Sequence, residues 1–226
     1  MADQSITTSI STTTTTTTTA AILTALHAQG YAPLATLPLA DAMPFLRQQL
    51  MRPTAITLPY FLLVFGCMVG LGVLGGWAAA GHGGASALAS LFAGIGATLL
   101  LIYLHEAIHA AVYRALGARH VYIKANWRKL YFLCTADGFV VGYAAFVRLA
   151  YMPALVITSG CLAAMVLSWA LGATYAITFF AGMAGMHLAL CGGDVALMSF
   201  LYTHRHRQPL TWDEEATGIS YFYALP

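Results

Sequence analysis

Residues 99–117 read LLLIYLHEAIHAAVYRALG, a stretch that is apolar almost throughout and yet contains two histidines and a glutamate. The run is long enough to continue a helix through a membrane, where every ionisable side chain carries a large free-energy cost. Ionisable groups in such a helix indicate a functional site by default. His105, Glu106 and His109 are the groups that this stretch has to accommodate.

The composition of the whole chain indicates an integral membrane protein. Of its 226 residues, 59% are hydrophobic and only 8% are charged, and the mean hydropathy is +0.73. Soluble domains carry about 25% charged residues. The net charge of +2 is too small to indicate nucleic-acid binding, and no basic run with interleaved aromatic residues occurs. We therefore expect a lipid bilayer as the environment and no nucleic-acid partner.

Four apolar segments are each long enough for a membrane span of about 20 residues. They cover residues 58–80, 87–113, 149–171 and 175–202. The expected fold is an all-α membrane protein of four transmembrane helices, with a β-rich, hairpin-like insertion at residues 119–148 between the second and the third. In the first span, four glycines follow a spacing that suits close helix packing in lipid. These are Gly66, Gly70, Gly72 and Gly76.

The insertion contains two stretches of β-prone residues, HVYIK (120–124) and KLYFLC (129–134). Asp137-Gly138 follows them, before a third such stretch, FVVGY (139–143), and predicts a hairpin turn. Three further segments flank the membrane domain of residues 58–204. We expect a disordered threonine-rich tail, a cytoplasmic or interfacial segment and a cytoplasmic C-terminal tail, at residues 1–20, 21–57 and 205–226.

The distribution of basic residues predicts the orientation of the spans. All ten lie before the first span, between the second and third, or after the fourth, and the other two connections contain none. They are Arg47, Arg52, Arg114, Arg119, Lys124, Arg128, Lys129, Arg148, Arg205 and Arg207. By the positive-inside rule, both termini and the β-rich insertion are expected on the cytoplasmic side.

Residues 105–109, HEAIH, form an HExxH motif on a predicted helix. Histidines four residues apart share a helix face, with Cβ atoms about 6 Å apart, so both imidazoles can reach one ion. His105 and His109 are therefore candidate zinc ligands, and Glu106 is the candidate general base acting on a zinc-bound water. The structural alternative is a helix-end cluster in which the histidines bond to backbone or lipid headgroups.

A catalytic zinc site usually has a third protein ligand. Asp194 is the only other carboxylate inside an expected span. At a rise of about 1.5 Å per residue, His109 lies about 8 Å and His105 about 13 Å from the charge of Arg114. By the same measure Asp194 lies about 16 Å from Arg205. The three side chains thus converge at a similar depth, which makes Asp194 the candidate third ligand of a set that favours zinc. The alternative is a buried carboxyl that is protonated or capped by backbone.

His187 lies seven residues, or two helical turns, before Asp194 on the same face. It is a candidate fourth ligand, a group that orients a ligand, or a donor to an oxyanion. The alternative, with equal weight, is a polar side chain that is hydrogen-bonded within the helix bundle and has no role at a metal. The residues alone do not separate these roles.

Several of these features together resemble one known family. HEAIHA (105–110), the β-rich insertion, a third span with Pro153, and GGDVALM (192–198) in the fourth are similar to the "putative zincin peptidase" family of bacterial membrane proteins. That family is itself similar in plan to the site-2 proteases. The closing WDEEATGISYFYALP (212–226) also looks like its tail, and the resemblance covers residues 42–226.

The resemblance implies a zinc metalloprotease of the bacterial cytoplasmic membrane, with several spans. In it, His105, His109 and Asp194 hold the metal and Glu106 is the catalytic base. The resemblance also implies a membrane-embedded or membrane-proximal protein or peptide substrate, paired as an extended strand with the insertion at residues 121–124 or 130–134. One feature departs from the pattern: site-2 proteases place Asn-Pro before their aspartate, whereas glycines precede Asp194 here.

Two other functions fit the same residues. A non-catalytic metal-binding membrane protein, such as a sensor, a carrier subunit or a pseudoprotease, would need His105, His109 and Asp194 but no base at Glu106. A structural membrane protein would use the cluster as an internal hydrogen-bond network and would bind no stoichiometric metal. The oligomeric state stays open.

Overall fold

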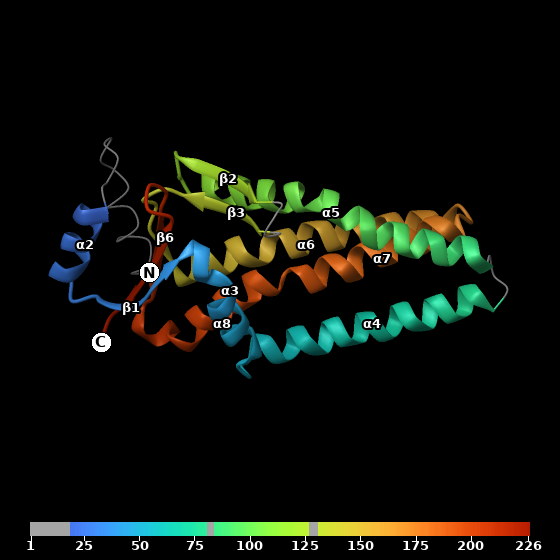
Figure 1. The fold of residues 1–226 in the computed structure, drawn as a ribbon, viewed down its shortest axis with the longest axis horizontal. Helices are drawn as coiled ribbons and strands as arrows, with labels where there is room; N and C mark the ends of the chain where they lie inside the picture. The colour runs from blue at the N-terminus through green and yellow to red at the C-terminus, as the bar shows by residue number, and fades with distance from the viewer. Residues whose placement is uncertain (1–18, 81–83, 127–130) are drawn as a thin grey trace.

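The computed structural model describes residues 19–80, 84–126 and 131–226. Most of the helices form an elongated bundle, and the strands gather at one end of it (Figure 1). In chain order the elements are α2 (Thr19–Ala28), β1 (Ala32–Pro38), η1 (Leu39–Asp41), α3 (Ala42–Met51), α4 (Thr57–Ala79), α5 (Gly84–Ala115), β2 (Val121–Asn126), β3 (Tyr131–Ala136), β4 (Val141–Gly142), α6 (Tyr143–Ala170), α7 (Thr174–Leu190), α8 (Gly192–Thr203), η2 (Arg205–Arg207), β5 (Leu210–Glu214) and β6 (Ile219–Ala224).

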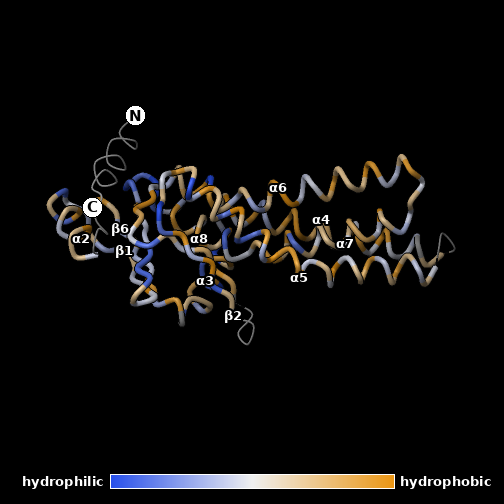
Figure 2. The backbone as a smooth tube through the Cα atoms, turned by 90° about the horizontal axis from the view of Figure 1, so that it is seen from above, coloured by the Kyte–Doolittle hydropathy of each residue, from blue (hydrophilic) through white to orange (hydrophobic). Residues whose placement is uncertain are grey.

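Four helical segments of the described chain are long and apolar enough to cross a membrane, in agreement with the four expected spans. They are Thr57–Trp77, Gly84–Ala115, Tyr143–Ala170 and Thr174–Thr203. Figure 2 shows hydrophobic positions along the bundle and a concentration of hydrophilic ones at the end that holds the sheet. Helix α6 begins at Tyr143, so the insertion ends earlier than the expected boundary at residue 148. Its last residues, through Arg148, are helical rather than β-rich.

The closest packing between spans occurs where glycines of α5 and α7 meet. A Cβ atom at Gly94 would lie 1.9 Å from the carbonyl oxygen of Phe179, and one at Gly182 would lie 2.4 Å from that of Leu91. Neither position has room for a side chain, and the two backbones therefore approach closely. The glycines singled out in the first span do not take part in this contact. At Gly66, Gly70, Gly72 and Gly76, no other helix or strand of the described residues comes within 4 Å of the place where a Cβ would stand.

The fourth span is broken at Cys191, where α7 ends and α8 begins. A break exposes carbonyl groups that have lost their helical partners. The Tyr60 hydroxyl of α4 donates to two of them, the carbonyl oxygens of Leu188 and Ala189, at 3.2 and 2.9 Å. A Cβ atom at Gly192 would lie 3.3 Å from this hydroxyl, so glycine suits the contact. The break turns the chain so that the residues after it start a new helix.

A four-stranded antiparallel sheet joins the two ends of the described chain, in the order β1-β6-β5-β4. Ala32 of β1 is paired with Ala224 of β6. Helix α2 packs on this sheet through Ile22 and Leu26, which are fully buried with Trp212. The sequence predicted an interfacial segment at residues 21–57 and a tail at residues 205–226, and the pairing of β1 with β6 joins the two. Pairing between distant segments leaves no local signal in the sequence. Thr19 already belongs to α2, and residues 1–18 of the expected disordered tail lie outside the described residues.

The insertion forms a two-stranded antiparallel pair, β2 with β3. Asp137-Gly138 was expected to be a hairpin turn between residues 129–134 and 139–143, and that prediction was wrong. These two residues follow β3 and lead to β4, which pairs with β5 of the other sheet. Asp137 accepts a hydrogen bond from the Glu215 backbone N–H at 2.9 Å, and Gly138 donates to the Asp213 carbonyl at 2.9 Å. The turn therefore binds the insertion to the C-terminal hairpin.

A group of charged side chains surrounds Asp213 where the two sheets meet. Burial raises the pKa of the Asp213 carboxyl to about 6, and the neighbouring carboxylates of Glu215 and Asp137 act in the same direction. The Ser220 hydroxyl, which donates to this carboxyl, and the Lys124 ammonium both lower the pKa. Burial outweighs them, so Asp213 carries its charge at neutral pH with an energetic cost.

We expect Asp213→Asn to stabilise the protein at pH 7.5 by about 1–2 kcal/mol, a figure reduced for partial exposure of the side chain. The folded pKa lies above the unfolded one, so the folded state binds more protons between about pH 4 and 6. As the pH rises through this window, the free energy of unfolding of the wild type therefore falls relative to that of the variant. Above about pH 6 the difference between the two proteins stays constant. Thermal unfolding in detergent from pH 4 to 8 measures the difference. Parallel curves for the two proteins would contradict the burial of this charge.

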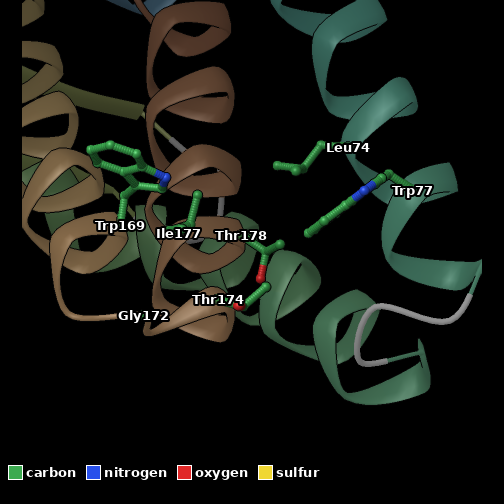
Figure 3. A pocket seen from close by; sticks show the side chains of 7 residues that line it. All are labelled: Leu74, Trp77, Trp169, Gly172, Thr174, Ile177 and Thr178. Atoms are coloured by element: carbon green, nitrogen blue, oxygen red, sulfur yellow. The ribbon is translucent and has the colours of Figure 1, made fainter.

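An open groove lies at the other end of the bundle, between α4 and the α6–α7 connection (Figure 3). Leu74 and Trp77 of α4 form one wall, and Trp169, Ile177 and Thr178 form the other. Tryptophan at such positions is typical of the membrane–water interface. The groove is separated along the bundle from the histidines of the HExxH motif.

Candidate metal centre

The two histidines of the HExxH motif lie one turn apart on α5 and face each other. Their Nε2 atoms are 3.0 Å apart, and their ring centroids are 4.8 Å apart at an interplanar angle of 73°. This follows from helix geometry, because residues four apart are neighbours on one face. His109 is buried and His105 is partly exposed. Two nitrogen donors are thus presented at one point.

Asp194 reaches the same point from the first turn of α8, just after the helix break. Its Oδ2 lies 3.1 Å from Nε2 of His105, and its Oδ1 lies 3.3 Å from Nε2 of His109. The three donor atoms lie within 4.8 Å of one another. The depth argument from the sequence thus predicted a contact that the structure contains, and the break in the fourth span gives the carboxylate its direction.

The other ring nitrogen of each histidine has a partner that fixes the ring. Nδ1–H of His109 donates to the carbonyl oxygen of Leu149 in α6 at 3.1 Å. Nδ1 of His105 is hydrogen-bonded to Nε2 of His187 in α7 at 3.2 Å. A hydrogen bond at Nδ1 sets the tautomer that leaves the Nε2 lone pair free for a metal ion. The surrounding helices therefore orient both imidazoles.

Glu106 points away from the donor atoms and toward the insertion. Its side chain is only 7% exposed, and its carboxylate accepts a hydrogen bond from the backbone of Cys134 in β3. The direction is that expected of the residue next to His105, since consecutive helical residues are rotated by about 100°. A buried carboxylate thus lies beside the two imidazoles without being one of the converging donors.

The comparisons with known proteins give a match for this part of the chain. Residues 98–208 match the model of a family described as "Putative zincin peptidase". This segment, just under half of the chain, is therefore similar to that family. The match runs from the middle of α5 to just beyond α8, and it includes every candidate site residue. No curated protein and no solved structure matches the chain.

Similarity to a zincin peptidase family implies zinc as the cofactor. The residues present fit this metal, because two imidazole nitrogens and one carboxylate oxygen form a known catalytic zinc set. The donors come from α5 and α8, and two hydrogen-bonded partners already hold the histidine rings. His105, His109 and Asp194 are therefore the residues that would hold zinc in this protein.

A second set of donors lies next to the first. His105, His187 and Cys191 also have donor atoms within 4.8 Å of one another. His187 is 2% exposed, and its Nδ1 lies 3.9 Å from Sγ of Cys191. His187 contacts Nδ1 of His105, whereas Asp194 contacts Nε2, so the two partners bind opposite ring nitrogens. This geometry favours the role of a group that orients a ligand over that of a fourth ligand.

We expect His187→Ala to weaken zinc binding by roughly 10–100-fold, the usual effect of removing a partner that orients a metal ligand. The physical reason is that the His105 ring loses its hydrogen bond and with it a fixed tautomer. Competition titration with a zinc chelator in detergent measures the change. His120→Ala, at an exposed position before β2, is the control. An unchanged affinity in His187→Ala would show that the bundle alone orients His105.

Some contacts of the site had no signal in the sequence. The Leu149 carbonyl and the Cys134 backbone contribute main-chain atoms, which any residue carries, so no residue type reveals them. Tyr60 was also missed, although a tyrosine near the start of an apolar span is a sign of a polar contact at the interface. The break between α7 and α8, whose carbonyl groups Tyr60 binds, had a local sign in the sequence in the two glycines before Asp194.

Proposed function

We propose that this protein is a zinc metalloprotease of the membrane, which hydrolyses peptide bonds in membrane-embedded or membrane-proximal substrates. The observation that carries the proposal is the convergence of the His105, His109 and Asp194 donor atoms within 4.8 Å. The buried Glu106 beside them and the match to the zincin peptidase family support a hydrolytic use of this set. When bound, zinc would polarise the scissile carbonyl and lower the pKa of water to about 7.

Glu106 is the residue to which we assign proton transfer. Its carboxylate adjoins the donor set, and its burial limits the access of competing water. In the proposed reaction a water oxygen attacks the carbonyl carbon and its proton passes to Glu106. The carbon–nitrogen bond then breaks, and Glu106 returns the proton to the leaving amine. His105, His109 and Asp194 take no part in this transfer.

The insertion offers a way to present an extended substrate. A peptide bond inside a helix is hidden by its own hydrogen bonds, so the substrate has to unwind before cleavage. Strand β3 pairs with β2 on one side, and the backbone of Cys134 contacts Glu106 on the other. A substrate strand that adds to the free edge of β3 would lie next to the proposed base.

The proposed orientation follows from the basic residues and places the sheet end of the bundle at the cytoplasmic side. His105, His109 and Asp194 lie toward that end of their spans, so cleavage would occur in the cytoplasmic half of the bilayer. We assign the protein to the cytoplasmic membrane of a bacterium because its sequence resembles the putative zincin peptidases of bacterial membranes. Reactivity of single engineered cysteines toward an impermeant reagent in intact cells and inverted vesicles tests this orientation.

The function is tested with the purified full-length protein in liposomes that contain a mixture of single-span membrane proteins. Mass spectrometry identifies new chain termini after incubation. We expect new termini with zinc-loaded wild type, none after zinc chelation and none with Glu106→Gln. Zinc-loaded wild type that produces no new terminus from any member of the mixture would count against proteolysis.

A further inference from the structure

The β2–β3 hairpin lies between two other parts of the protein, one on each face. Directly paired residues of an antiparallel ladder share a face, and Ile123 is paired with Cys134 in this hairpin. Cys134 and Ala136 are buried in a cluster with Ala110 and Tyr113 of α5. The neighbouring positions, including Thr135, point to the opposite face. Because Thr135 is fully buried, that face must also be covered.

Glu215, in the turn between β5 and β6, covers the opposite face. Its Oε1 lies 2.7 Å from Nζ of Lys124 in β2, and its Oε2 accepts a hydrogen bond of 3.1 Å from the Thr135 hydroxyl in β3. Its own backbone N–H donates to Asp137 at 2.9 Å. One residue of the C-terminal hairpin therefore contacts both strands of the insertion and the turn that follows them.

These contacts lead directly to the proposed base. Thr135, which Glu215 binds, is the residue after Cys134, whose backbone bonds the Glu106 carboxylate. A shift of β3 away from α5 would break the bond to Glu106 and change the direction of its carboxylate. Glu215 opposes such a shift because its carboxylate holds β3 from outside the hairpin.

We propose that Glu215 is a positioning residue, which clamps the β2–β3 hairpin onto α5 and thereby fixes Glu106. The proposal rests on the proposed function only in treating Glu106 as the base. The clamp joins the C-terminal hairpin to the catalytic region through side chains that the reaction itself does not use. Removal of its carboxylate leaves Lys124 without this ion pair and the buried Thr135 hydroxyl without its acceptor.

Cys134 provides a native reporter of the clamp. It is a free cysteine, 7% exposed, in the strand that Glu215 holds. Burial, with the nearby Glu106 charge, raises the pKa of its thiol to about 12, so the closed hairpin reacts slowly with a maleimide, which attacks thiolate. Cys161 is equally buried within the helix bundle and reports loosening of the spans instead.

The experiment is maleimide labelling of the full-length protein in detergent, with each cysteine quantified by mass spectrometry. We expect Glu215→Ala to raise the labelling rate of Cys134 roughly 10-fold, the factor for about 1.4 kcal/mol of lost interaction, and to leave that of Cys161 unchanged. Glu215→Gln, which keeps an acceptor for Thr135, should give a smaller rise and serves if the alanine variant does not fold. Glu214→Ala is the matched control, because its carboxylate contacts Thr217 and Tyr221 of its own hairpin and Thr19 of α2 instead of the insertion.

An exchange of charges separates clamping from general damage. Lys124→Glu places a carboxylate beside Glu215 and should raise the labelling rate of Cys134. Adding Glu215→Lys restores an ion pair and should bring the rate back to within about 3-fold of wild type, the rest reflecting the lost acceptor of Thr135. No recovery in the double variant, or no rise in Glu215→Ala, would overturn the proposal.

The two proposals fail in distinguishable ways. Labelling of Cys134 requires neither zinc nor a substrate, so it measures the clamp even if the protein cleaves nothing. With an active protein, we expect Glu215→Ala to lower kcat more than it changes KM, at unchanged zinc content. Faster labelling with unchanged kcat would show that the hairpin is clamped but that Glu106 does not depend on it, which would overturn the positioning role.

Discussion

Glu106→Gln is expected to lower kcat roughly 10³-fold while the protein keeps its zinc, because general acid–base catalysis contributes about 10²–10⁴-fold to rates. The amide has nearly the shape of the carboxylate and can still accept a hydrogen bond from the Cys134 backbone. It cannot take up a proton from water. Since the Glu106 carboxylate is not among the converging donors, metal binding should not change.

Two measurements on the same preparation check this expectation. Cleavage is followed with a substrate found among the liposome proteins, and zinc is determined per chain by elemental analysis. Glu214→Gln, at the end of β5, is the control for the loss of one glutamate. Full cleavage by Glu106→Gln would remove the residue from the reaction. Intact cellular function in this variant, with zinc bound, would favour a non-catalytic metal-binding protein.

The second large effect is expected in zinc content, which should fall from about one ion per chain to near zero in both His109→Ala and Asp194→Ala. Each change removes one of three donors, and we expect an affinity loss greater than the roughly 100-fold typical of changes around a ligand. The two residues lie on different helices, α5 and α8. Loss of zinc in both would show that the ion joins these helices.

His109→Ala also leaves the Leu149 carbonyl without its donor, so thermal unfolding has to be compared between the variants. His120→Ala, which changes an exposed histidine, is the control for zinc content. Zinc that persists in Asp194→Ala but is lost in Cys191→Ala would move the ion to the neighbouring donor set of His105, His187 and Cys191. No zinc in wild type, with zinc offered in excess, would favour the structural alternative.

Much of the membrane part could be predicted from the sequence because its signals are local. An apolar run has to be helical in lipid, where the backbone can satisfy its hydrogen bonds only within the segment. The spacing of His105 and His109 places them on one helix face in any context. Even the approach of Asp194 could be predicted, because helices that cross the same bilayer share a common scale of depth.

The sheet could not be predicted in the same way. Ala32 and Ala224 are paired, and neither segment carries a mark of the other, because β-ladders form between backbones at any separation in the sequence. The misassigned turn has the same cause. Asp137-Gly138 has the local chemistry of a hairpin turn, but the strand after it pairs with β5, a segment more than 60 residues further along the chain, and not with β3.

The sequence by itself determined the four apolar spans, the pair of histidines on one helix face and the presence of a carboxylate at a matching depth. Each depends on periodicity or on the cost of polar groups in lipid, which act over short stretches of chain. Only the tertiary structure decided that His187 binds the outer nitrogen of His105, that Glu106 faces β3, and that Glu215 holds that strand. These are contacts between separate elements, and their directions are set by packing rather than by the residue types involved.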